Sequence, residues 1–70
     1  MNQVLIEAIR RNIKSLRVKA GYTQETAAEE LEVSRETMFR WEKEPQQMPI
    51  IKLAKLAKLY DCSVKDFFAE

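Results

Sequence analysis

Polar and aromatic side chains gather on one face of a helix that the sequence predicts over residues 35–43. Met38 and Trp41 are spaced as neighbours on a helix surface and define its inward face. The opposite face then carries Arg35, Glu36, Phe39, Arg40 and Lys43. This face combines cations, a carboxylate and an aromatic ring, so it is suited to hydrogen bonding and to apolar contact with a ligand.

Each of these side-chain types matches a feature of a DNA base. Arg pairs bidentately with guanine N7 and O6, Glu accepts from cytosine N4, and an aromatic ring covers a thymine methyl group. When a helix enters the major groove of DNA, the residues near its start contact base edges. Arg35 and Glu36 are therefore the leading candidates for base contact, followed by Phe39 and Arg40. Two alternatives stay open. Glu36 and Arg40 can form an i, i+4 pair worth about 0.2–0.5 kcal/mol on a solvated face, and Phe39 can serve surface packing.

Two short helices joined by a tight turn would position these side chains. They lie within residues 23–44, TQETAAEELEVSRETMFRWEKE. Thr23 and Ser34 each precede a helix-forming run, where a side-chain oxygen can cap unpaired backbone N–H groups. Ala27 and Ala28 are small enough to let the two helices approach closely. This is the layout of a helix-turn-helix, whose second helix is suited to a DNA major groove.

The segment resembles the helix-turn-helix of the Cro and phage-repressor (XRE-like) family. The matching positions are Thr23-Gln24 at the start of the first helix, Ala28 at the small-residue position, Val33-Ser34 before the recognition helix and Trp41-Glu42 near its end. Residues 13–21 and 53–68 extend the similarity over nearly the whole chain. Glu32 departs from the family, which often has Gly at the turn, so it must accept a left-handed backbone at some cost or reshape the turn.

The fold that the resemblance implies is all-α, a five-helix lambda-repressor-like DNA-binding domain that occupies residues 1–70 as a single unit. Apolar spacing and cap residues place the helices at about 3–20, 24–31, 35–43 and 49–60, with a short last helix after Ser63. Gly21 and Asp61 are expected in left-handed conformations at helix ends, and residues 44–49 in a loop.

The resemblance also implies a set of DNA-backbone contacts. Gln24 matches the phosphate-contacting glutamine at the start of the family's second helix. Arg17 and Glu42 match an ion pair that ties the first helix to the end of the third and orients Arg17 beside the DNA backbone. The remaining candidates for phosphate contact are Thr23, Ser34, Lys43, Gln46 and Gln47. Capping is an equally good explanation for the two hydroxyl residues.

Composition excludes several other classes of protein. The chain of 70 residues has one Gly and two Pro, which favours an ordered helical domain. With no His and a single Cys, it has no zinc-finger pattern and no internal disulfide, and we predict no metal and no cofactor. The sequence has no His base, no Gly-rich phosphate loop and no nucleophile elbow, so we do not expect an enzyme. No apolar run is long enough to span a membrane, so we expect a cytoplasmic protein.

The net charge of +1 is unevenly distributed along the chain. Residues 1–22 carry five basic residues against one acid, residues 23–44 three against seven, and residues 45–70 four against three. An acidic helix-turn-helix predicts weak nonspecific attraction to DNA. It also motivates an alternative function, a protein-interaction module or antitoxin component that binds a basic protein partner.

The function that fits these features best is sequence-specific binding of double-stranded DNA by a transcription regulator. The form that we expect is a repressor that binds an inverted repeat as a homodimer. Five apolar residues exceed what a small core needs, and they are either a self-association patch or scattered surface apolarity: Val4, Leu5, Leu59, Phe67 and Phe68.

Overall fold

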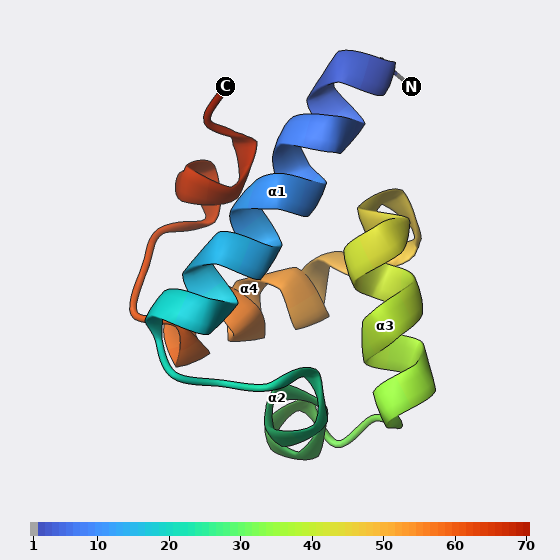
Figure 1. Ribbon diagram of the computed structural model, residues 1–70, viewed down its shortest axis with the longest axis vertical. Coiled ribbons are helices and arrows are strands. Elements are labelled where there is room, and N and C mark those ends of the chain that lie inside the picture. The colour runs from blue at the N-terminus through green and yellow to red at the C-terminus, as the bar shows by residue number, and fades with distance from the viewer. Residues whose placement is uncertain (1) are drawn as a thin grey trace.

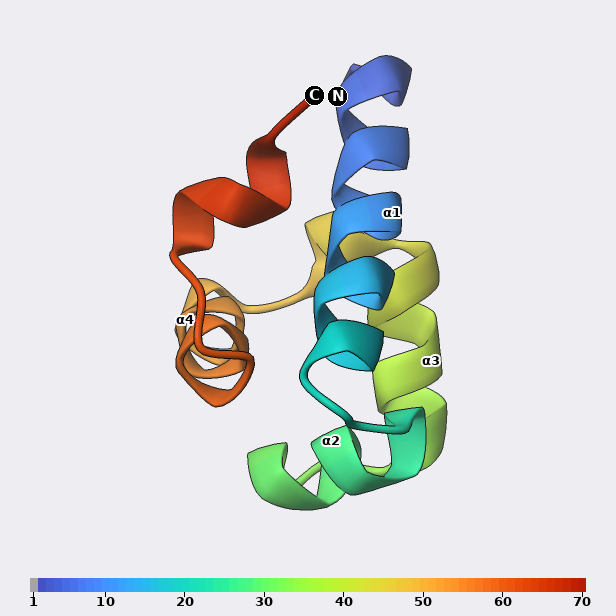
Figure 2. The same cartoon turned by 60° about the vertical axis from the view of Figure 1, so that its left-hand side comes forward.

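The computed structural model describes residues 2–70, which form four α-helices and two 3₁₀ turns and contain no strand. The helices are α1 (Gln3–Lys19), α2 (Gln24–Leu31), α3 (Arg35–Lys43) and α4 (Ile50–Leu59), and the turns are η1 (Pro45–Gln47) and η2 (Val64–Phe68). α1 lies between α3 on one side and η2 on the other, and α2 crosses below them (Figures 1 and 2). Within residues 2–70 no helix is long and apolar enough to cross a membrane.

Side-chain caps begin the first three helices. The Asn2 carboxamide oxygen accepts from the backbone N–H of Val4 at 2.8 Å. Thr23 Oγ1 accepts from the Thr26 N–H at 3.0 Å, and Ser34 Oγ accepts from the Thr37 N–H at 3.1 Å. The two caps predicted for the helix-turn-helix are therefore confirmed, and they explain why α2 and α3 begin where they do.

Residues with a left-handed backbone conformation follow three of the helices, where the chain turns sharply. Gly21 has φ +88° after α1, Glu32 has φ +58° after α2, and Asp61 has φ +55° after α4. Glu32 therefore keeps the backbone of a glycine turn and bears the strain of its Cβ atom, rather than reshaping the turn. The backbone N–H of Val33 still reaches the Ala28 carbonyl at 3.0 Å, which closes the end of α2.

The prediction of five α-helices is wrong for the last one. Residues Val64–Phe68 form the 3₁₀ turn η2, because so short a segment offers few i→i−4 hydrogen bonds. The Asn12 side chain instead donates to the carbonyls of Phe67 and Ala69, at 3.0 and 2.6 Å. The predicted loop before α4 also contains a turn, η1, which Pro45 begins.

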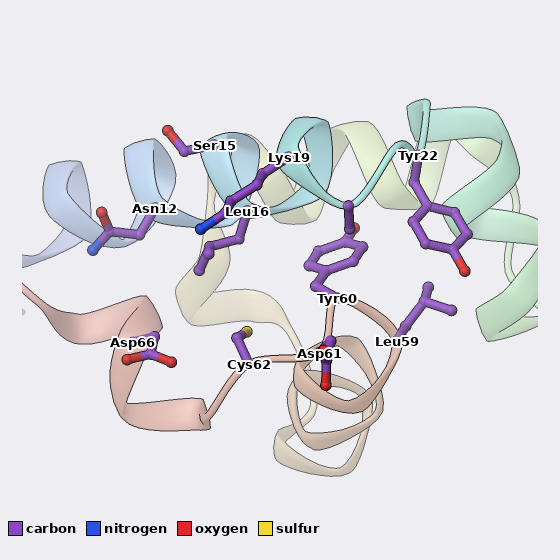
Figure 3. Close-up of a pocket in the computed structure, with 11 residues that line it drawn as sticks. Asn12, Ser15, Leu16, Lys19, Tyr22, Leu59, Tyr60, Asp61, Cys62 and Asp66 are labelled. Carbon is purple, nitrogen blue, oxygen red and sulfur yellow. The ribbon is translucent and has the colours of Figure 1, made fainter.

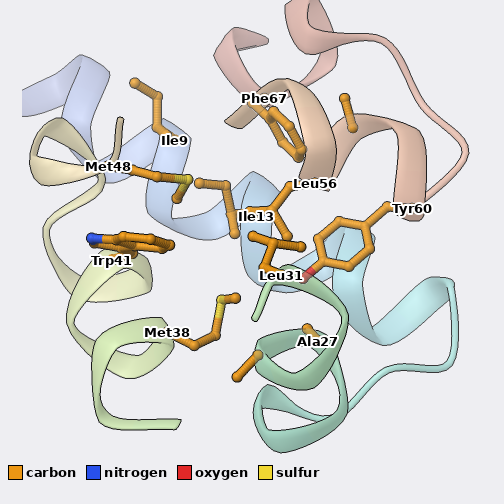
Figure 4. Close-up of a cluster of buried hydrophobic side chains, with 12 residues drawn as sticks. Ile9, Ile13, Ala27, Leu31, Met38, Trp41, Met48, Leu56, Tyr60 and Phe67 are labelled. Atoms are coloured by element: carbon orange, nitrogen blue, oxygen red, sulfur yellow. The ribbon is translucent and has the colours of Figure 1, made fainter. Parts of the chain in front are cut away.

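The core takes side chains from every helix and from η2 (Figure 4). Its largest fully buried members are Ile13, Met38, Leu56 and Phe67. The expectation that Phe67 is a surface residue is therefore wrong, and Leu5 and Leu59 are partly buried against the core. Only Val4 and Phe68 of the five apolar residues are exposed, so the five do not form one surface patch.

Candidate nucleic-acid interface

The outer face of α3 presents the predicted base-contacting side chains to solvent. Arg35, Glu36, Phe39 and Arg40 are placed there, and Phe39 keeps 56% of its surface exposed. Met38 and Trp41 of the same helix are 0% and 7% exposed, so the predicted inward face of α3 is confirmed. Core packing therefore fixes the rotation of the helix about its axis and with it the set of side chains that a ligand meets.

Glu36 and Arg40 do not form the i, i+4 ion pair that sequence alone left open. The ion pair found within residues 2–70 joins Arg17 to Glu42 instead. Glu36 lies with Arg35 and Phe39 around a shallow hollow of about 170 Å³. The carboxylate and the guanidinium of these two neighbours are thus available for hydrogen bonds to a ligand.

A buried carboxylate joins the three elements behind this face. Glu42 of α3 accepts from Arg17 Nε of α1 at 2.5 Å and from Gln24 Nε2 of α2 at 3.1 Å. Arg17 Nη1 also donates to the Tyr22 carbonyl at 2.9 Å, just before α2. Glu42 and Arg17 are each 8% exposed, so these contacts are largely shielded from water. The network holds the start of α2 against the end of α3.

Arg17 is better suited to positioning than to contacting DNA. Its guanidinium makes three hydrogen bonds to the protein, and the residue is buried. Gln24 is only half-buried, and its amide has a second N–H and a carbonyl that Glu42 does not use. Of these two predicted phosphate contacts, the geometry favours Gln24.

Fewer side-chain donors are free for a phosphate than the sequence indicates, both at Thr23 and Ser34 and in the loop after α3. Ser34 Oγ donates to Thr37 Oγ1 at 2.9 Å, and Thr23 Oγ1 lies 3.1 Å from Thr26 Oγ1. The Gln47 amide donates to the Glu44 carboxylate. The side chains of Lys43 and Gln46 make no such bond among the described residues.

Three adjoining hollows connect these residues into one surface. The first, about 170 Å³, lies on α3 and includes Arg35 and Phe39. The second, about 760 Å³, runs from the end of α1 to the start of α2 and includes Arg35 and Gln24. The third, about 490 Å³, lies between α1 and α3 and includes Gln24 and Phe39. Arg35, Phe39 and Gln24 therefore stand where the hollows meet.

Two basic residues outside the predicted site donate hydrogen bonds to carbonyls at the C-terminal ends of α2 and α3. Arg10 Nε of α1 donates to the carbonyl of Lys43, in the last turn of α3. Lys52 Nζ of α4 donates to the Leu31 carbonyl at the end of α2, at 2.9 Å. A cation at a helix C-terminus satisfies an unpaired carbonyl and complements the helix dipole. Sequence spacing carries no signal for either contact, since both join separate helices.

A larger hollow of about 780 Å³ lies between the second half of α1, the end of α4 and η2. Leu16 and Lys19 line its α1 side, and Cys62 and Asp66 lie across from them (Figure 3). Burial, followed by the negative charges of Asp66 and Asp61, raises the pKa of the Cys62 thiol. The thiol is therefore protonated at neutral pH and a poor nucleophile.

The Tyr60 hydroxyl is buried close to the Arg17–Glu42 pair. It has no hydrogen-bond partner within residues 2–70, and the ring packs edge-on against Phe67. Burial raises the pKa of this hydroxyl above its ordinary value; the charge of Glu42 raises it further and that of Arg17 opposes the rise. Tyr60 is thus a neutral core residue at physiological pH.

A helix-turn-helix with an exposed polar face on its second helix defines a class of DNA-binding proteins. A family model described as helix-turn-helix matches residues 13–67. The chain therefore belongs to the helix-turn-helix family of the Cro/C1 (XRE) type, whose members are DNA-binding regulators and generally not enzymes. Comparison with curated proteins and with solved structures gave no match.

Proposed function

We propose that the protein is a sequence-specific transcription regulator that represses by binding an inverted-repeat operator as a homodimer. Residues 1–70 would act as one DNA-binding domain in the cytoplasm, with the helix-turn-helix at residues 23–44. The observation that carries this proposal is the face of α3, where Arg35, Glu36, Phe39 and Arg40 face solvent while Met38 and Trp41 are buried. Family membership supports DNA binding and transcription regulation.

The proposed complex places α3 in the major groove. Arg35 and Glu36, in its first turn, contact base edges, and Phe39 and Arg40 extend the contact by one turn. Gln24 donates to a phosphate at the start of α2, where unpaired backbone N–H groups and the helix dipole favour an anion. The two recognition helices of a dimer enter successive major grooves about 34 Å apart.

Selection of bound sequences from random duplex DNA tests this function, followed by fluorescence-anisotropy titrations of the selected duplex over a range of salt. We expect an enriched inverted repeat. We also expect a log–log salt slope near −5, since a dimer that neutralises about six phosphates releases a similar number of counterions. A selection that enriches no sequence, together with no binding at low ionic strength, would contradict the proposal.

A protein-binding function is the second candidate, and the outer surface of α2 supports it. Four glutamates lie on α2 and its turn, and none of them forms an ion pair within the described residues: Glu25, Glu29, Glu30 and Glu32. Such a surface is complementary to a basic protein, as in an antitoxin that binds both its toxin and its own promoter. Reversing Glu29 and Glu30 to Lys would abolish capture of such a partner and strengthen nonspecific DNA binding.

A further inference from the structure

A groove between α1 and α3 gathers a third of the basic residues of this nearly neutral chain. It has a volume of about 490 Å³, and four basic residues line it: Arg10, Arg11, Lys14 and Lys43. The acids beside them are Glu7 and Glu42, of which Glu42 is paired with Arg17. The groove therefore has an excess of positive charge, although the whole chain carries only +1.

The position of the groove relates this charge to the recognition helix. α1 packs against α3 (Figure 2), and basic residues of α1 line this groove together with Phe39 and Lys43 of α3. Phe39 lines both this groove and the hollow of Arg35 and Glu36. Gln24 lies in its wall as well. A ligand on the outer face of α3 would therefore pass the groove at its edge.

The basic residues that α1 contributes to the groove differ in whether their donors are already used by the protein or are free for a ligand. Arg10 donates to the Lys43 carbonyl, so its guanidinium holds α1 to the end of α3. Lys14 is exposed and makes no hydrogen bond or ion pair within residues 2–70. Arg11 is also exposed, and only its Nη2 has a partner, the Ala69 carbonyl at 3.4 Å. Lys14 and Arg11 are thus two cations on α1 with donors left for a ligand.

We propose that this groove binds the sugar–phosphate backbone that borders the major groove entered by α3, with Lys14 and Arg11 as the donors. The inference rests on the proposed function, because it assumes that α3 contacts DNA. A phosphate backbone runs along each edge of the major groove, and cations beside the recognition helix neutralise it. The contact supplies affinity that the acidic helix-turn-helix lacks, without adding sequence preference.

The test compares Lys14→Gln and Arg11→Gln with Lys58→Gln on the selected operator and on a scrambled duplex, over a range of salt. Lys58 is an exposed lysine of α4 that lines a separate hollow with Glu30 and Leu59, so its substitution removes the same charge elsewhere. Melting curves check that each variant is folded. We expect Lys14→Gln and Arg11→Gln to weaken binding of both duplexes by the same factor. The salt slope should become shallower by about 0.9 for each phosphate that the variant no longer neutralises, and Lys58→Gln should match the wild type.

The possible outcomes distinguish a failure of this inference from a failure of the proposed function. If the wild type binds its operator and both groove variants keep its salt slope, the groove does not hold phosphate and the proposed function stands. If Lys14→Gln weakens only the operator complex, Lys14 contacts bases and the phosphate assignment is wrong. If the wild type binds no DNA, the proposed function fails, and the inference that rests on it fails too.

Discussion

Glu42 shows how one residue can serve both the fold and the interface. Its two carboxylate oxygens accept from Arg17 of α1 and from Gln24 of α2. The first contact pairs two charges that burial would otherwise penalise, and the second fixes the amide that we propose contacts phosphate. The orientation of Gln24 therefore depends on a residue that is itself buried behind the proposed DNA-contacting surface.

Breaking the Arg17–Glu42 pair should destabilise the protein strongly. Glu42→Leu leaves the Arg17 guanidinium buried without its carboxylate, for which we expect a loss of about 3–5 kcal/mol in the free energy of unfolding. Arg17→Met combined with Glu42→Leu removes both charges and should lose much less. Urea denaturation of the single and double variants measures both values. Equal losses would show that burial does not penalise the unpaired Arg17 guanidinium.

Arg35 and Gln24 should differ in what they contribute to binding. Arg35→Ala removes a proposed bidentate base contact, so discrimination between operator and scrambled DNA should fall by about 1–3 kcal/mol. Gln24→Ala removes a phosphate contact and should weaken both complexes evenly. Anisotropy titrations of each variant with both duplexes measure this difference. An even loss from Arg35→Ala would assign Arg35 to the backbone instead.

At the scale of elements, the turn between α2 and α3 stores strain at one residue. Glu32 adopts φ +58° and ψ +43°, a conformation that costs a residue with a Cβ atom roughly 1–2 kcal/mol. The turn keeps this conformation because α2 and α3 pack closely through Ala27, Ala28 and Met38 on their inner sides. Packing between the two helices thus overrides the local preference of the turn residue.

Replacing Glu32 with Gly should therefore stabilise the protein. Glycine adopts the left-handed conformation without strain, and its greater unfolded-state entropy offsets part of the gain, so we expect a net increase of about 0.5–1 kcal/mol. Glu29→Gly is the matched control, because Glu29 is an exposed glutamate inside α2, where Gly should cost about 1 kcal/mol. Thermal unfolding compares the two variants. A destabilising Glu32→Gly would mean that the Glu32 side chain contributes more than its strain costs.

At the scale of the whole molecule, the most exposed large apolar side chain of residues 2–70 lies at the start of α4. Ile50 is 82% exposed and its neighbour Ile51 63% exposed, and the turn η1 connects them to the end of α3. A contact between two copies at this place would fix the distance between their recognition helices. Neither residue belonged to the self-association patch expected from the sequence, of which only Val4 and Phe68 are exposed.

If the protein forms the proposed dimer through these residues, substitution of Ile50 and Ile51 by Lys should prevent its formation without unfolding the monomer. Both side chains are already in water in the single chain, so little buried area is removed by the substitutions. Sedimentation equilibrium, with and without operator DNA, measures the association. Val4→Lys is the control, since Val4 is 61% exposed on α1. Dissociation by the control alone would place the contact at the start of α1.

Local patterns in the sequence determine the helices and their faces. Thr23 and Ser34 cap α2 and α3 as predicted, and the apolar pair Met38 and Trp41 defines the inner side of α3. These features depend on residues three or four positions apart, whose relative placement a helix fixes by itself. The side chains that α3 presents were therefore predictable. The Arg17–Glu42 pair, which joins residues 25 positions apart, came from the family resemblance.

The tertiary structure alone decides which separate helices meet and at what angle. Phe67 was expected on the surface but is fully buried, because η2 packs against α1, where Asn12 donates to the Phe67 carbonyl across 55 positions of sequence. Arg10 reaches α3 from a distant part of the chain, and Arg11 and Lys14 of the same helix line a groove beside α3. A charged helix face has the same sequence pattern whether water or another helix lies beside it. Only the tertiary structure distinguishes these two situations. The packing of α1 against α3 depends on contacts throughout the core, which no local pattern in the sequence determines.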